Sequence, residues 1–144
     1  MRIYLDNCCY NRPFDYQMNA RIRVETEAKL AIQQAIKDGK IELAWSYILD
    51  YENSANPYPE RRETIAQWRS FSTVDADENP SILRNASDLM KKGLSNIDAL
   101  HVAAASHTQC AFFITTDDGI LSKSRLIKTM TILDPTEFVR KVEL

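Results

Sequence analysis

The chain has 144 residues, 44% of which are hydrophobic, and it carries a formal net charge of −2. This length fits one domain spanning residues 1–144 with a hydrophobic core of its own, and it excludes a miniprotein that needs disulfides or metals to fold. The charge balance excludes a strongly basic nucleic-acid binder, so contact with phosphates would have to use local basic patches or a bound cation.

Apolar periodicity and turn residues predict the elements of the chain. In the first half of the chain, the pattern predicts a strand at 2–5, a loop or short turn at 7–17, a helix at 20–37, a strand at 41–45, a helix from Ser46 toward Asn56 and a helix at 60–71. In the second half, it predicts a brief strand at 72–74, a turn at 75–80, helices at 81–92 and 95–106, a strand at 110–115, a turn at 118–119, a strand at 130–133 and a helix at 135–142.

Strands therefore alternate with helices over the whole chain. This alternation is typical of an α/β fold, here a three-layer sandwich with a mainly parallel central sheet. In such sheets, binding sites form beyond the carboxyl ends of the strands, near the point where the strand order reverses.

The most apolar run, residues 110–114, is far too short to cross a bilayer, and the first residues lack the long apolar stretch of a signal peptide. The three cysteines, Cys8, Cys9 and Cys110, form no C-x-x-C pair. We expect them to be packed thiols in a reducing compartment. The sequence thus predicts a cytoplasmic protein without membrane contact.

Four acids stand at positions where they could form one site. Asp6 and Asp117 lie at or just beyond the ends of two predicted strands, and Glu52 and Asp98 lie on predicted helices. If the two strands are parallel, their carboxyl ends share one edge of the sheet. Crowded carboxylates repel one another unless a divalent cation neutralises them, and Mg²⁺ or Mn²⁺ accepts such oxygen ligands. A metal held in this way can activate water against a phosphodiester.

Each acid also has a purely structural alternative. Asp6 could be a helix cap or a turn residue after its strand, and Asp117 could stabilise the turn before Gly119. Glu52 could be a solvated helix residue. Asp98 could form a capping box with Ser95. These roles are the better interpretation of each residue taken alone, whereas the four residues together favour a functional site.

Five stretches, in this order and spacing, carry a resemblance to a known family. They are Ile3-Tyr4-Leu5-Asp6-Asn7, Ser46-Tyr47-Ile48-Leu49-Asp50-Tyr51-Glu52, Asn96-Ile97-Asp98-Ala99-Leu100-His101-Val102-Ala103-Ala104-Ala105, Phe113-Ile114-Thr115-Thr116-Asp117 and Ile132-Leu133-Asp134-Pro135-Thr136-Glu137-Phe138. Over nearly its whole length the chain resembles PIN domains, as found in the VapC ribonucleases of toxin–antitoxin pairs.

The resemblance implies a metal-dependent endoribonuclease that hydrolyses RNA, of the kind that serves as the toxin of a type II toxin–antitoxin pair. By the same resemblance, Mg²⁺ or Mn²⁺ is the cofactor, RNA the substrate, an antitoxin protein the partner and a homodimer the assembly. The implied catalytic residues and metal ligands are Asp6, Glu52, Asp98 and Asp117. The implied supporting residues are Asn7, Ser46 and Thr116.

The segment 7–15 departs from typical VapC toxins and indicates a distinct PIN subgroup. Within it, Arg12 could contact RNA phosphate or form a structural salt bridge. His101 follows Asp98 by one turn on or near the same helix face, and we expect a packed core histidine there rather than a site residue.

Two other functions compete with the nuclease. The first is a catalytically silent PIN-fold module that binds or regulates, which predicts no metal affinity. The second is a phosphotransfer enzyme with Asp6 as nucleophile, which would need a second aspartate two residues later, where this chain has Cys8.

Overall fold

A computed structural model describes all residues from Met1 to Leu144 and has a five-stranded sheet at its centre. The strand order is β3-β2-β1-β4-β5, and every pair of neighbours is parallel. The predicted α/β class with a parallel sheet is therefore confirmed. The strands are β1 (Arg2–Leu5), β2 (Glu42–Ser46), β3 (Ser72–Ala76), β4 (Phe112–Ile114) and β5 (Thr131–Leu133).

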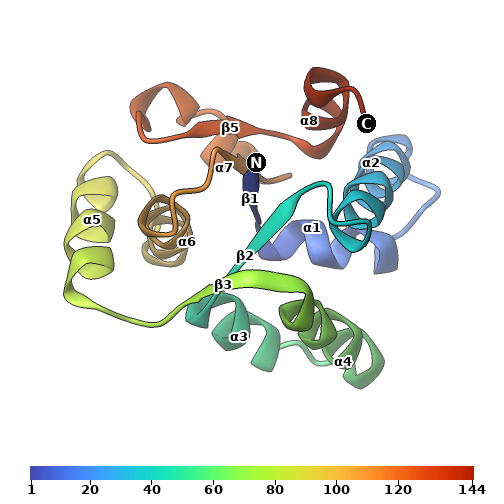
Figure 1. The fold of residues 1–144 in the computed structure, drawn as a ribbon, viewed down its shortest axis with the longest axis horizontal. Coiled ribbons are helices and arrows are strands. Elements are labelled where there is room, and N and C mark those ends of the chain that lie inside the picture. Colours follow the sequence, from blue (N-terminus) through green and yellow to red (C-terminus); the bar gives the residue numbers. More distant parts are fainter.

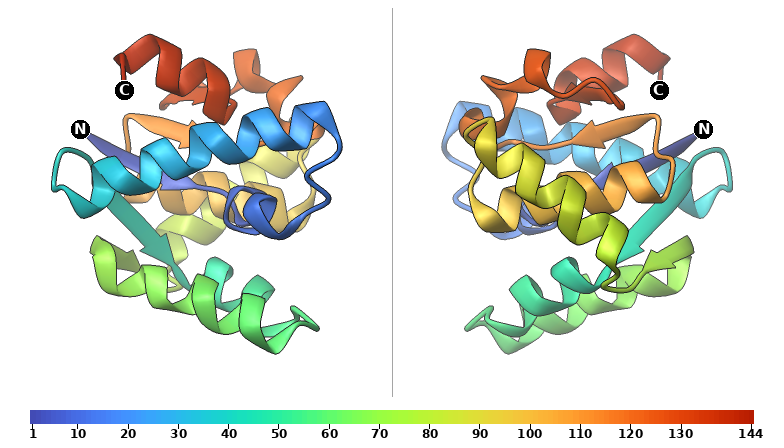
Figure 2. Two further views of the ribbon diagram at one scale, coloured as in Figure 1. Left: turned by 90° about the vertical axis from the view of Figure 1, so that its right-hand side faces the viewer. Right: turned by 90° about the vertical axis from the view of Figure 1, so that its left-hand side faces the viewer.

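Helices cover both faces of this sheet. In Figure 1, α2 and α8 lie on one side of the strands and α5 and α6 on the other, and Figure 2 shows each pair from the front. The helices are α1 (Asn7–Asn11), α2 (Ala20–Lys37), α3 (Tyr47–Ser54), α4 (Pro59–Gln67), α5 (Pro80–Lys91), α6 (Asn96–His107), α7 (Asp118–Leu121) and α8 (Pro135–Val142). Short 3-10 segments are η1 (Arg12–Phe14), η2 (Trp68–Phe71) and η3 (Ser124–Leu126).

The central strand β1 is the most buried part of the sheet. Ile3, Tyr4 and Leu5 have no exposed surface, because parallel strands flanked by helices are covered on both faces. In register, Tyr4 lies between Ala44 of β2 and Phe113 of β4. The Tyr4 and Phe113 rings stack with centroids 5.3 Å apart. The strand that leads into Asp6 is thus fixed on both sides.

Side-chain caps set the start of the long helices. Asn19, Ser46, Asn79 and Ser95 each accept a hydrogen bond from a backbone N–H in the first turn of the helix that follows. Since each cap satisfies a donor that has no partner inside the helix, it favours one starting residue. The predicted helices at 20–37, 81–92 and 95–106 agree with α2, α5 and α6 to within one residue at each end.

Two predicted connections are wrong in detail. Residues 7–17 were expected as a loop or short turn, but α1 and η1 lie there. The Asp6 side chain accepts from Asn7 N, and Cys9 and Tyr10 are buried, so capping and core packing outweigh the polar composition. The turn expected at 118–119 is the start of the one-turn helix α7.

The chain crosses the sheet once. It runs outward from β1 to β2 and β3, and it then returns to the other side of β1 as β4 and β5. The strand order therefore reverses between β1 and β4, where α/β proteins place their sites. None of the helices is long and apolar enough to cross a membrane.

Candidate metal centre

Asp6 follows β1 directly and is held by its neighbours. It is 5% exposed, and its Oδ1 accepts from Asn7 N at 2.8 Å. Its Oδ2 accepts from Thr115 Oγ1 at 2.8 Å and from the Cys8 thiol at 3.5 Å. Thr115 follows β4, so this bond joins the ends of the two adjacent strands at the crossover. The carboxylate is fixed before any ligand arrives, which is what a binding site requires.

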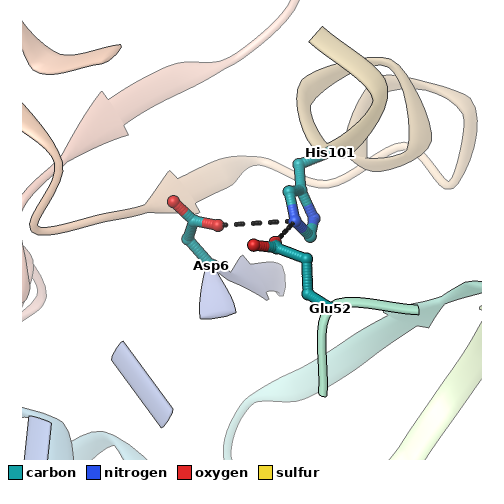
Figure 3. A group of neighbouring side chains, drawn as sticks. All are labelled: Asp6, Glu52 and His101. Atoms are coloured by element: carbon teal, nitrogen blue, oxygen red, sulfur yellow. Dashed lines mark hydrogen bonds and ion pairs between the residues drawn. The ribbon is translucent and has the colours of Figure 1, made fainter. Parts of the chain in front are cut away.

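Glu52 of α3 and His101 of α6 converge on Asp6. One ligand atom from each residue lies within 4.8 Å of the others. His101 Nε2 is hydrogen-bonded to Glu52 Oε1 and lies 3.7 Å from Asp6 Oδ1. Figure 3 shows the three side chains pointing toward one another from the end of β1, from α3 and from α6. We call Asp6, Glu52 and His101 the central trio.

The far side of the His101 ring is also bonded. Its Nδ1 lies 2.6 Å from the Tyr4 hydroxyl, which lies 2.6 Å from Ser46 Oγ. Tyr4, Ser46 and His101 are completely buried. Burial holds the pKa of Tyr4 well above its usual value, so the phenol stays neutral and can both donate and accept. This chain of hydroxyls fixes the direction of the imidazole.

Asp98 and Asp117 lie beside the central trio and are not part of that close group. Both are half-buried. Asp98 is in the first turn of α6, where its N–H donates to Ser95 Oγ at 3.3 Å. Asp117 caps α7 by accepting from Gly119 N at 2.9 Å. The structural roles considered for these acids are thus present, and they leave the carboxylates near the site.

The charges of these residues act on one another. Burial raises the pKa of Asp98 above its usual value, and the negative charges of Asp6 and Asp117 raise it further. Burial by itself lowers the pKa of His101, but the hydrogen bond that its Nε2–H donates to Glu52 and the charges of Asp6, Glu52 and Asp98 outweigh burial and raise the pKa. All four predicted acids therefore belong to one electrostatic neighbourhood.

The predicted supporting residues differ in how they contribute. Ser46 caps α3 and thereby positions the helix that carries Glu52. Asn7 donates its backbone N–H to Asp6, and its side-chain Oδ1 is buried without a partner. The hydroxyl bond to Asp6 comes from Thr115 rather than from Thr116. The Thr116 N–H instead donates to Cys8 Sγ at 3.3 Å.

Arg12 is engaged in salt bridges. Its guanidinium binds Glu25 at 3.0 Å and Asp15 at 3.1 Å. Both carboxylates belong to the protein itself, so these are structural salt bridges. The structural alternative for Arg12 is therefore present, and a phosphate would have to compete with two acids.

Three residues have a role at the site that was not predicted from the sequence. His101 was expected to be a packed core residue, and it is buried, but it also bonds Glu52 at the site. Tyr4 was predicted only as part of a buried strand, and the supporting role was predicted for Thr116 rather than for Thr115. The available signal for His101 was its i, i+3 spacing from Asp98, which puts both on one helix face.

The donors of this centre fit a divalent cation. Two carboxylates and one imidazole nitrogen converge within ligand range, and Asp98 and Asp117 add negative charge around them. Oxygen and imidazole donors of this kind bind divalent metals, which would offset the repulsion between the acids. An ion held here could bind a phosphate oxygen and activate water.

No family model and no curated protein matches the chain. Among solved structures, VapBC2 from Rickettsia felis bound to a DNA fragment from their promoter is similar, with a TM-score of 0.58 and 15% identity, over 93% of this chain and 98% of that chain. VapBC-1 from nontypeable Haemophilus influenzae is similar with a TM-score of 0.59 and 20% identity, over 94% of this chain and 99% of that chain. The resemblance noted in the sequence is confirmed at the level of the fold: this chain has the PIN-like α/β fold of these VapBC structures.

Proposed function

We propose that the chain is a metal-dependent endoribonuclease that hydrolyses RNA phosphodiester bonds and acts as the toxin of a type II toxin–antitoxin pair. The observation that carries this proposal is the convergence of Asp6 and Glu52 with the charges of Asp98 and Asp117 at the strand crossover. A nuclease of this kind needs a cluster of acids that holds a metal next to a phosphodiester.

The surroundings of the four acids favour different roles for them. Asp6 and Glu52 are the two acids of the central trio and would hold the ion. When bound, a Mg²⁺ or Mn²⁺ ion supplies a Lewis acid for a phosphate oxygen and lowers the pKa of water. Asp98 is suited to accept the proton of the attacking water, because burial and neighbouring charges raise its proton affinity. Asp117 is held by its own capping bond and would help to orient that water.

A protein partner is part of this proposal. The two solved structures that share the fold are both named as VapBC assemblies, and one of them is bound to promoter DNA. By analogy, this chain pairs with an antitoxin that blocks its site, and two copies of the chain form a homodimer. Copurification from a strain that carries the neighbouring genes tests the first point, and sedimentation tests the second.

The decisive experiment is RNA cleavage by the purified chain without a partner. We expect single-stranded RNA to be cleaved with Mg²⁺ or Mn²⁺ and not with EDTA. Asp98→Asn should lower the rate by at least about 100-fold, which is about 2.7 kcal/mol of lost transition-state stabilisation. The matched control is Asp88→Asn on the exposed face of α5, which should cleave normally.

The opposite result is equally clear. If metal-loaded protein, free of antitoxin, leaves a pool of random RNA sequences intact, the nuclease proposal is wrong. A chain that also shows no heat of Mn²⁺ binding would then be a silent module with a PIN-like fold.

A further inference from the structure

We propose that His101 is a nitrogen ligand of the metal centre, so that the site selects a divalent transition ion such as Zn²⁺, Co²⁺ or Mn²⁺ over Mg²⁺. The inference rests on the metal dependence proposed above and goes beyond it, because it adds a donor of a different element. An all-carboxylate site suits Mg²⁺, which prefers oxygen, whereas an imidazole nitrogen suits transition ions.

The first argument is distance. Carboxylate oxygens and imidazole nitrogens lie about 2.0–2.2 Å from a bound ion such as Zn²⁺, so two ligands of one ion are at most roughly 4.4 Å apart. The ligand atoms of the central trio already lie within 4.8 Å of one another. Asp98 and Asp117 do not join this group. A small decrease in the distances between these three atoms therefore suffices for them to surround one ion. The His101 nitrogen is one of the three.

The second argument is direction. His101 Nε2 points at Glu52 and Asp6. The ring is completely buried, so the surrounding atoms prevent it from rotating away. The Tyr4 ring packs against it nearly edge-on, with centroids 5.7 Å apart and the planes at 66°. The nitrogen is thus aimed into the acidic cluster by packing as well as by hydrogen bonding.

The third argument is the bond on the other nitrogen. A metal-binding histidine usually donates its second N–H to an acceptor, which fixes the tautomer. Here Nδ1 faces the Tyr4 hydroxyl at 2.6 Å, and this hydroxyl can donate its own hydrogen bond to Ser46 Oγ. Because a hydroxyl can both donate and accept, the Tyr4 oxygen can accept a hydrogen bond from Nδ1–H. In that tautomer the lone pair of Nε2 is free for an ion. The proton between Nε2 and Glu52 would be released to solvent when the ion binds.

The competing interpretation gives His101 a purely structural role. In that case Nε2–H keeps donating to Glu52 when the metal is bound, and the ion is held by oxygens alone. The two interpretations differ in one observable, which is whether Nε2 carries a proton or a metal in the loaded protein.

The chain offers an internal control, because it has two histidines. His107 lies at the other end of α6, where its Nε2 is 3.4 Å from Asn79 Nδ2. We would record ¹⁵N spectra of both imidazoles in the full-length wild-type protein before and after one equivalent of Zn²⁺. The expected result is a metal-bound shift for Nε2 of His101, a protonated Nδ1 and no change for His107. A loaded protein in which His101 Nε2 remains protonated would overturn the proposal.

Binding selectivity gives a second measurement. Titration calorimetry with Zn²⁺, Mn²⁺ and Mg²⁺ is compared for the wild type, His101→Gln and His107→Gln. We expect His101→Gln to reduce the preference for Zn²⁺ over Mg²⁺ by about tenfold or more, and His107→Gln to leave it unchanged. An unchanged preference in His101→Gln, with circular dichroism that matches the wild type, would contradict nitrogen ligation.

The outcomes separate this inference from the nuclease proposal. Zn²⁺ bound by His101 in a protein that never cleaves RNA would uphold the ligand and reject the nuclease. Metal-dependent cleavage with His101 still protonated at Nε2 would do the reverse. A wild-type protein that binds no divalent ion rejects both.

Discussion

Thr115 Oγ1 donates to Asp6 Oδ2 at 2.8 Å and also accepts the Asp117 N–H at 3.0 Å, so one hydroxyl links two of the four acids. The bond bridges 109 residues of sequence and joins the carboxyl ends of β1 and β4. It explains how acids from distant parts of the chain keep fixed positions although their charges repel one another.

Thr115→Val should therefore weaken the centre while preserving the shape of the side chain. Loss of a bond that orients a metal ligand typically reduces metal affinity or activity by about 10–100-fold, and we expect a decrease of that size. The measurement is Mn²⁺ affinity by calorimetry together with the RNA cleavage rate. Thr116→Val is the matched control, since the Thr116 hydroxyl makes no bond to Asp6. Equal effects of the two substitutions would argue against a positioning role for Thr115.

Asp98→Asn should make the metal-free protein more stable while it abolishes cleavage. The pKa of Asp98 is raised in the folded state, so the folded chain holds this proton more tightly than the unfolded chain. The charged form of Asp98 costs stability above that raised pKa, and the cost disappears as the pH falls below the unfolded value. Chemical denaturation at neutral pH in EDTA checks the sign. A variant less stable than the wild type under those conditions would show that Asp98 has structural bonds that matter more.

Metal binding should raise the melting temperature. An ion at 100 times its dissociation constant stabilises the folded state by about 2.7 kcal/mol, provided that the unfolded chain does not bind it. Scanning fluorimetry with EDTA and with Mn²⁺ measures this shift. Asp6→Asn should remove it, whereas Asp134→Asn, which changes the acid that caps α8, should retain it. The same shift in the Asp6→Asn protein would mean that the ion binds elsewhere.

Lys29 predicts a separate dependence on pH. This side chain is 2% exposed, and its ammonium lies 5.3 Å from the Tyr10 ring and 5.4 Å from the Trp68 ring, with no carboxylate among the groups that shift its pKa. Burial lowers its pKa to about 7, with Cys9 acting against this shift and Lys37 adding to it. Since the unfolded chain binds this proton more tightly than the folded chain, the lysine destabilises the fold at low pH. Stability should rise as the pH increases from about 7 toward the ordinary lysine value of 10.5.

Lys29→Met tests this sign directly. It should stabilise the protein at pH 6 by up to roughly 5 kcal/mol, because each unit of pKa shift corresponds to about 1.36 kcal/mol. The rise of stability above pH 7 should be smaller than in the wild type. Arg23→Met, at an exposed position on the same helix, is the control for loss of a positive charge. A pH profile that is the same in Lys29→Met and the wild type would refute the assignment.

Local signals predicted most of the fold. Apolar spacing and turn residues located α2, α5 and α6, because both signals lie within a few residues of each helix. The helix α1 could not be predicted in this way. Its five residues, Asn7–Asn11, are held by burial of Cys9 and Tyr10 against other elements, and that packing has no local signal.

The site was predictable only in part for a similar reason. Asp6 and Asp117 could be placed together because parallel strands end at one edge of the sheet. The role of His101 depends on Glu52, which is 49 residues away and on another helix. A histidine in an alanine-rich helix indicates burial, and only the tertiary contact adds the bond to the acid.

The single crossover of the sheet has a consequence for how the protein is made. Asp6 is synthesised well before β4, and β1 gains its second neighbour only when β4 has been synthesised. Pairing segments so distant in sequence is slow, because the long intervening loop must close first. Until that pairing forms, a growing polypeptide holds these acids apart, so the proposed metal site would exist only after β4 has joined β1.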